Sequence, residues 1–98
     1  MQKNLRESII VLESCKAILI SEFNIEAVAI FGSMARRQNH RNSDIDILVR
    51  FSKLPSFFEL ARIEKFLQSK LQIRIDLVIE NDAEKVFIDR ISRDIIAV

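Results

Sequence analysis

The sequence is poor in the residues that punctuate or cross-link a chain. Its 98 residues include one cysteine, Cys15, one glycine, Gly32, and one proline, Pro55. A single cysteine cannot form an intramolecular disulfide and excludes an all-cysteine metal site. Because glycine tolerates a positive φ and a closely approaching ligand better than any other residue, Gly32 is the first position to examine for function.

The sequence also lacks a charge excess and a long apolar segment. Fifteen Lys and Arg residues against fourteen Asp and Glu residues leave a formal net charge of +1, whereas proteins that bind nucleic-acid phosphates usually have a strong basic excess. No apolar run approaches the roughly 20 residues that span a bilayer. We therefore expect a soluble, cytoplasmic protein of one small domain, residues 1–98, that binds neither nucleic acid nor membrane.

Hydrophobic periodicity predicts alternating helices and strands. Helices are predicted over residues 2–21, 34–38, 57–70 and 83–93, with Ser33 and Ser56 as N-caps of the second and third. Strands are predicted over residues 25–31, 44–51 and 72–79. The order αβαβαβα indicates an α/β (α+β) fold, a small sheet of three or more strands flanked by helices. The pattern alone allows parallel or mixed pairing of the strands.

Some apolar positions are assigned to the core by the same patterns. In the first helix Ile18 is expected beside the stripe that contains Leu12 and Leu19. Phe57 and Phe58 are more often core residues than stacking platforms, although an exposed pair would suit a partner surface.

Asp44 and Asp46 are the first candidates for chemistry. Aspartate is depleted in strands, and two of them at i and i+2 place both carboxylates on one face. Like charges so close need a compensating cation, and Mg²⁺ prefers carboxylates together with phosphates and water. The alternative is that two hydrated aspartates merely begin a solvent-facing strand.

Asp76 strengthens the metal interpretation. It occupies the polar phase of the third predicted strand, between Ile75 and Leu77. A third carboxylate from a neighbouring strand is what a two-metal nucleotidyl-transfer site requires. The alternative is an ion pair with Arg74 or Arg50.

Gly32 and Ser33 form a candidate phosphate site. A strand that ends in glycine and opens directly into a helix presents unpaired backbone N–H groups to an anion. The sequence contains neither GxxxxGK[ST] nor GxGxxG, which excludes the P-loop and Rossmann fingerprints.

Together these residues reproduce the pattern GS…DxD…D. The stretches AIFGSMARR from residue 29, SDIDILV from residue 43 and IDLV from residue 75 resemble the DNA polymerase β-type nucleotidyltransferase superfamily. They are most similar to the minimal nucleotidyltransferase (MNT) antitoxins, which are encoded with HEPN-domain toxins. The resemblance covers the chain from about residue 22 onward and implies the nucleotidyltransferase fold with a mixed sheet.

The resemblance implies a role for each matching position. The catalytic and metal-binding set is Asp44, Asp46 and Asp76, which would hold one or two Mg²⁺ ions, with Asp76 also activating the acceptor hydroxyl. The nucleotide-binding set is Gly32, Ser33 and Arg36. A solvated helix face is an equally good interpretation of Arg36. The family often carries a glycine or acidic residue soon after this arginine, whereas Arg37 and Gln38 follow here.

Three functions are compatible with this pattern. The first is an antitoxin of a type VII-like pair that transfers AMP from ATP to a hydroxyl of its HEPN ribonuclease toxin, a tyrosine by resemblance, and so silences it in a hetero-oligomer. The second is an antitoxin that neutralises the toxin by stoichiometric complex formation without catalysis. The third, a transferase acting on RNA or a small molecule, lacks the expected basic surface or extra domain. Because Gly32, Ser33 and all three aspartates are present, the sequence favours the first.

Overall fold

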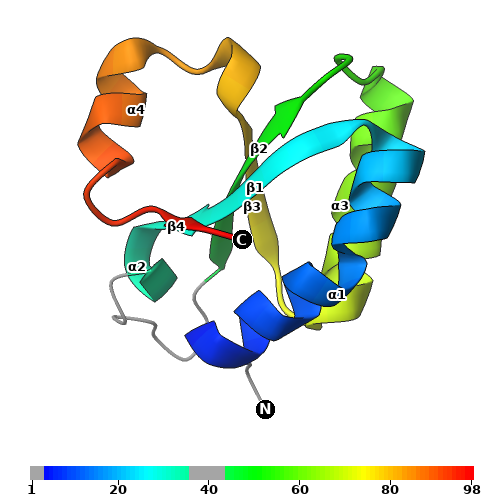
Figure 1. The fold of residues 1–98 in the computed structure, drawn as a ribbon, viewed down its shortest axis with the longest axis horizontal. Helices are drawn as coiled ribbons and strands as arrows, with labels where there is room; N and C mark the ends of the chain where they lie inside the picture. The colour runs from blue at the N-terminus through cyan, green and yellow to red at the C-terminus, as the bar shows by residue number, and fades with distance from the viewer. Residues whose placement is uncertain (1–3, 36–43) are drawn as a thin grey trace.

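The computed structural model describes residues 4–35 and 44–98, and these form a four-stranded mixed sheet with helices on both faces (Figure 1). The strand order is β3-β2-β1-β4. The helices are α1 (Leu5–Phe23), α2 (Gly32–Ala35), α3 (Phe57–Leu71) and α4 (Lys85–Ile91), with a 3₁₀ turn, η1, at Glu80–Asp82. The strands are β1 (Ile25–Phe31), β2 (Ile45–Phe51), β3 (Ile75–Ile79) and β4 (Ile96–Ala97).

Strand pairing follows from the connections. β1 and β2 are antiparallel, with Val28 opposite Val49, whereas β2 and β3 are parallel because α3 carries the chain back across the sheet between them. β4 pairs antiparallel with the other edge of β1. The sheet is therefore mixed, which residue patterns alone did not decide.

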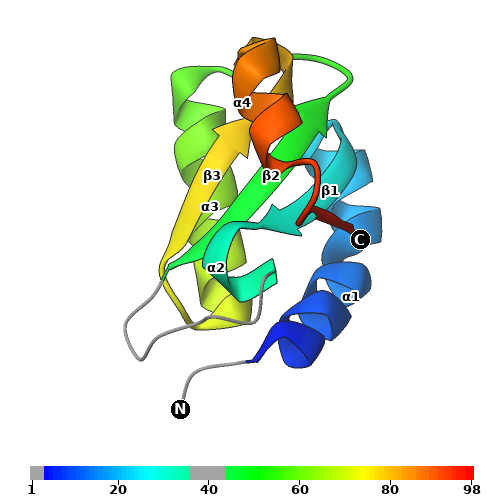
Figure 2. The same ribbon diagram turned by 90° about the vertical axis from the view of Figure 1, so that its left-hand side faces the viewer.

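Two hydrophobic clusters cover the two faces of the sheet. α1 and α3 pack on one face, where alternate residues of β2 (Ile45, Ile47 and Val49) are fully buried against them. α4 packs on the opposite face over a smaller cluster that includes Leu48 and Val78 (Figures 1 and 2). The period-2 alternation of β2 and β3 thus assigns even-numbered residues to the α4 face.

Local signals in the sequence fix the ends of the long helices. Asn4 and Ser56 cap α1 and α3 by accepting hydrogen bonds from the backbone N–H groups of Glu7 and Glu59. Both helices end in a left-handed residue, of which Asn24 is the break expected from the sequence. None of the helices in the described part of the chain has the length and apolar character needed to cross a bilayer.

Several boundaries and burial assignments predicted from the sequence are wrong. The third strand begins at Ile75 rather than Gln72, the last helix spans only Lys85–Ile91, and β4 was not predicted because two residues carry no periodicity. α2 begins at Gly32, so Ser33 is the second residue of that helix and not the residue that precedes it.

The core positions predicted for three apolar side chains are also wrong. Phe57 and Phe58 are 82% and 81% exposed and pack edge-to-face on one another, and Ile18 is also exposed. Phe66 alone of the three phenylalanines of α3 packs against the core.

Candidate active site

The three aspartates predicted as metal ligands lie at one edge of the sheet, where β2 and β3 begin. Asp46 and Asp76 are direct neighbours in the parallel β2–β3 register. Asp44 immediately precedes β2, and the backbone N–H of Ile45 extends the ladder by donating to the carbonyl oxygen of Arg74 at 3.0 Å. Because in-register neighbours and residues at i and i+2 point to the same side of a sheet, all three aspartates are on one face.

This face is the one that α4 covers. Leu48 and Val78, which continue the same alternation along β2 and β3, belong to the hydrophobic cluster under α4. The carboxylates therefore lie beside the surface that α4 buries, at the end of the sheet where β1 runs into α2 (Figure 2). We call this end, with Asp44, Asp46 and Asp76, the acidic end of the sheet.

Gly32 is held against Asp46 by the sheet itself. Phe31, the last residue of β1, pairs with Asp46, so the next residue lies next to the Asp46 side chain. A Cβ atom added to Gly32 would overlap the carboxylate oxygen Oδ2 of Asp46 and lie 2.9 Å from its Cγ. Gly32 also has a φ of +76°, which residues with a side chain rarely adopt. The lone glycine is thus required twice, for its backbone conformation and for the space that the carboxylate occupies.

The ion pairs differ from those anticipated for Asp76. Arg74 donates from Nε to Oδ1 of Asp44 at 3.2 Å, and Arg50 is paired with glutamates at the opposite end of β2. None of the ion pairs among residues 4–35 and 44–98 includes Asp76, whose side chain is exposed. The alternative of an Asp76 ion pair with Arg74 or Arg50 is therefore wrong for the described residues.

The contact between Arg74 and Asp44 was missed by sequence reasoning. The signal that could have found it is the register: once Asp46 is level with Asp76, Asp44 must be level with Arg74. That register could not be read from the chain because the parallel pairing was itself undecided.

The three carboxylates are ligands of the type that Mg²⁺ prefers, but they do not form a closed coordination cage. Among the described residues no group of three His, Cys, Asp or Glu side chains is arranged to hold a metal ion, and Asp44 is paired with Arg74. Mg²⁺ usually takes one or two carboxylates and completes its shell with water and substrate phosphates, so a closed cage is not required. The oxygen-only donors on one face, and the space left at Gly32 for the Asp46 carboxylate, fit this chemistry.

The remaining sequence-predicted residues are only partly placed. Gly32 and Ser33 are the first two residues of α2, directly after β1. Arg36, the third predicted nucleotide-binding residue, lies outside the described residues.

The family model for "Polymerase beta, Nucleotidyltransferase" matches residues 13–98 of the chain. This match includes the acidic end of the sheet and Gly32. It covers most of the chain, from the middle of α1 onward.

Two named relatives are similar over nearly their whole length. A candidate protein adenylyltransferase of Methanocaldococcus jannaschii is 37% identical over 89 residues, which is 90% of this chain and 91% of that protein. The protein adenylyltransferase MntA of Thermococcus cleftensis is 30% identical over 88 residues, covering 90% and 89% of the two chains.

Solved structures share the fold. One described as a minimal nucleotidyltransferase superposes with a TM-score of 0.73 at 26% identity, covering 98% of this chain and 95% of the other. The Shewanella oneidensis MNT antitoxin complex with its tri-AMPylated HEPN toxin gives 0.63 at 20% identity, covering 92% and 70%. The chain belongs to the polymerase β nucleotidyltransferase family, in the branch of small protein adenylyltransferases, and is a nucleotidyltransferase.

Proposed function

We propose that the chain is an antitoxin that transfers AMP from ATP to a tyrosine hydroxyl of a cognate HEPN-domain ribonuclease toxin, in a Mg²⁺-dependent reaction that silences the toxin. The observation that carries this proposal is the in-register pairing of Asp46 with Asp76 beside Gly32. The relatives support the reaction class, since they are named protein adenylyltransferases. The acceptor is inferred from the fold neighbour whose partner toxin is AMPylated.

The proposed reaction is an in-line displacement at phosphorus. The acceptor hydroxyl oxygen attacks the α-phosphorus of ATP, the bond to the bridging oxygen breaks, and pyrophosphate leaves with that electron pair. Asp76, the most exposed of the three carboxylates, accepts the hydroxyl proton as general base. Asp44 and Asp46 would hold Mg²⁺ against the triphosphate, and the ion supplies Lewis-acid stabilisation of the phosphate charge when bound.

The partner toxin is expected to complete the site. The described residues supply the carboxylates and the β1–α2 junction, and Asp76 is exposed, so an acceptor from outside the chain can approach it. A macromolecular partner that docks its own hydroxyl converts the step into an effectively intramolecular one, which lowers the barrier by several kcal/mol. We therefore expect slow AMP transfer to free tyrosine and fast transfer to the toxin.

A label-transfer assay tests the proposal. The chain is incubated with Mg²⁺, α-labelled ATP and the co-purified toxin, and the label on the toxin is mapped by peptide mass spectrometry. Asp44→Asn is expected to abolish transfer and toxin neutralisation while the complex still forms. The matched control is Asp82→Asn, the same chemical change in η1 at the opposite end of β3.

The assay separates catalysis from neutralisation by binding alone. If Asp44→Asn still protects cells from the toxin, or if no nucleoside triphosphate labels the toxin in a stable complex, the chain acts by stoichiometric binding and the proposal is wrong. Label on a serine or threonine would retain AMP transfer and overturn only the tyrosine assignment.

A further inference from the structure

Arg74 and Asp44 are held beside one another by the backbone and not only by their charges. The hydrogen bond from the Ile45 N–H to the Arg74 carbonyl places the residue before β2 level with the residue before β3. From there the Arg74 guanidinium reaches the Asp44 carboxylate at 3.2 Å. The arginine therefore stays within reach of the acidic end even when the ion pair opens.

The ion pair is too exposed to be explained by folding stability. The Arg74 side chain is 81% exposed and that of Asp44 is 38% exposed. Ion pairs in such positions contribute about 0 to 1 kcal/mol, because water screens the charges and two side chains lose freedom. A pair this weak opens readily, so a stronger cation at Asp44 would displace the guanidinium at little cost.

The charge arrangement gives the pair a different role. Three carboxylates begin two neighbouring strands on one face, where their mutual repulsion is largest when no cation is present. Arg74 supplies a positive charge at this edge, and it holds the Asp44 carboxylate in a defined orientation. The same guanidinium repels a divalent ion that approaches Asp44.

We propose that Arg74 is the resident counter-cation of Asp44, which a divalent metal ion must displace in order to bind. This inference rests on the proposed function, because it takes Asp44 as a metal ligand. Arg74 is a positioning residue: it orders Asp44 before the metal arrives and weakens metal binding in the absence of nucleotide. The site thereby favours the metal that enters together with the triphosphate, whose negative charge offsets the displaced arginine.

Metal binding without nucleotide or toxin tests the inference. The probe is Mn²⁺ alone, titrated into the intact chain and followed by the electron paramagnetic resonance signal of the free ion. Removing the charge with Arg74→Gln is expected to tighten Mn²⁺ binding about three- to tenfold, the range for one charge acting on a divalent ion through solvent at this distance. Arg74→Lys, which keeps the charge, should stay within about twofold of the original affinity.

The matched control is Arg50→Gln. Arg50 is ion-paired like Arg74, although it is less exposed (49% against 81%), and it lies on the face of β2 that Asp44 shares, six residues or about 20 Å from Asp44 along the strand. Because this separation exceeds the Debye length of about 10 Å at 0.1 M salt, Arg50→Gln should leave Mn²⁺ affinity within about twofold. The difference between the two variants should shrink as salt is added.

Unchanged or weaker Mn²⁺ binding in Arg74→Gln would overturn the inference, and so would an equal gain in Arg50→Gln. If Asp44→Asn binds Mn²⁺ as tightly as the original chain, the metal lies elsewhere and the inference fails with the assignment of Asp44. The AMP-transfer activity is decided separately by the label-transfer assay, so failure here does not decide the proposed function.

Discussion

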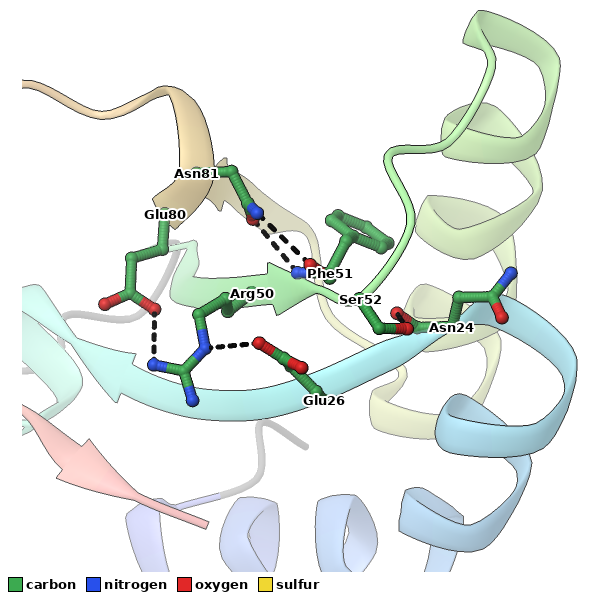
Figure 3. Close-up of polar contacts among 7 residues, drawn as sticks. All are labelled: Asn24, Glu26, Arg50, Phe51, Ser52, Glu80 and Asn81. Atoms are coloured by element: carbon green, nitrogen blue, oxygen red, sulfur yellow. Dashed lines mark hydrogen bonds and ion pairs between the residues drawn. The ribbon is translucent and has the colours of Figure 1, made fainter.

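The two ends of the central sheet carry charged side chains in opposite arrangements. At the end where β2 finishes, Arg50 lies between Glu26 of β1 and Glu80 of η1, at 2.8 and 3.7 Å (Figure 3). At the acidic end, Asp46 and Asp76 stand side by side, and the described ion pair there is that of Asp44 with Arg74.

Backbone hydrogen bonding separates the two ends in the same way. Beyond the last β2–β3 pair, the Asn81 side chain takes over the ladder: it accepts from the Phe51 N–H at 3.0 Å and donates to the Phe51 carbonyl at 3.1 Å (Figure 3). Ser52 donates from both its N–H and its hydroxyl to the Asn24 carbonyl. The Arg50 end is thus closed by contacts within the chain, whereas the acidic end brings three aspartates together on one face. The difference teaches that, among the described residues, the Arg50 end is joined by contacts that stabilise the fold, whereas the acidic end gathers the residues assigned to the proposed reaction.

The largest expected effect is at Asp76. Asp76→Asn should lower AMP transfer to the toxin about a thousandfold or more, because loss of the base and of a metal-facing charge removes several kcal/mol of transition-state stabilisation. The free energy of unfolding should stay the same or rise slightly, because removing one of three like charges relieves repulsion. Steady-state transfer kinetics and urea unfolding measure the two quantities.

A loss of more than about 1 kcal/mol in the free energy of unfolding of Asp76→Asn would show that Asp76 stabilises the fold. Asp82→Asn is the control, and it should change neither quantity appreciably.

Gly32→Ala is expected to have the next largest effect. The added methyl group overlaps the Asp46 carboxylate, and alanine is strained at a φ of +76°. We expect AMP transfer to fall about a hundredfold through the displaced carboxylate and the free energy of unfolding to fall by about 1 to 2 kcal/mol.

A double-variant cycle separates the two causes. In an Asp46→Ala background the carboxylate is gone, so the destabilisation by Gly32→Ala should shrink to the backbone term alone. If Gly32→Ala destabilises the Asp46→Ala variant as much as it destabilises the original chain, the overlap with the Asp46 carboxylate does not contribute to the loss of stability.

At the other end, Asn81→Ala should affect stability without affecting catalysis. Loss of both hydrogen bonds to the Phe51 backbone should destabilise the chain by about 1 to 2 kcal/mol. Asn81→Asp keeps an acceptor for the Phe51 N–H but turns a carboxylate oxygen toward the Phe51 carbonyl oxygen, so it should destabilise the chain at least as much as Asn81→Ala. Denaturant unfolding gives the stability, and a fall in AMP transfer of more than about threefold at full folding would contradict the separation of the two ends.

The smallest effect is expected at Arg50. Both of its ion pairs are substantially exposed, so Arg50→Gln should change the free energy of unfolding by at most about 1 kcal/mol, with the change diminishing in salt. AMP transfer should not change. A loss of several kcal/mol in the free energy of unfolding would contradict this prediction, because it would show that the ion pairs of Arg50 contribute substantially to folding stability.

Much of the fold could be predicted from local signals in the sequence. β1 was predicted at its observed bounds, β2 and the start of α3 to within one residue, and Ser56 and Asn24 at the ends of their helices. These elements carry strong periodicity or side chains that cap locally. β4 carries neither, because two residues paired to β1 are defined only by their partner strand.

The candidate site could likewise be predicted only in part. Residue types and spacing singled out four candidates: Gly32, Asp44, Asp46 and Asp76. Aspartate is depleted in strands, and a lone glycine indicates a position where a side chain does not fit. Spacing could not reveal that Gly32 makes room for Asp46, or that Arg74 belongs to Asp44. Both contacts join segments that meet only across the sheet.

The sequence by itself singled out the candidate site residues and showed which faces of the strands are apolar, because both depend on side-chain type and on period along one segment. The resemblance implied the mixed sheet that is observed, but only the tertiary structure decided which strands pair in parallel, the level at which Asp46 meets Asp76, and the contrast between the two ends of the sheet. The physical reason is that strand register is a relation between segments: sliding β3 along β2 would leave every local signal intact and separate the carboxylates.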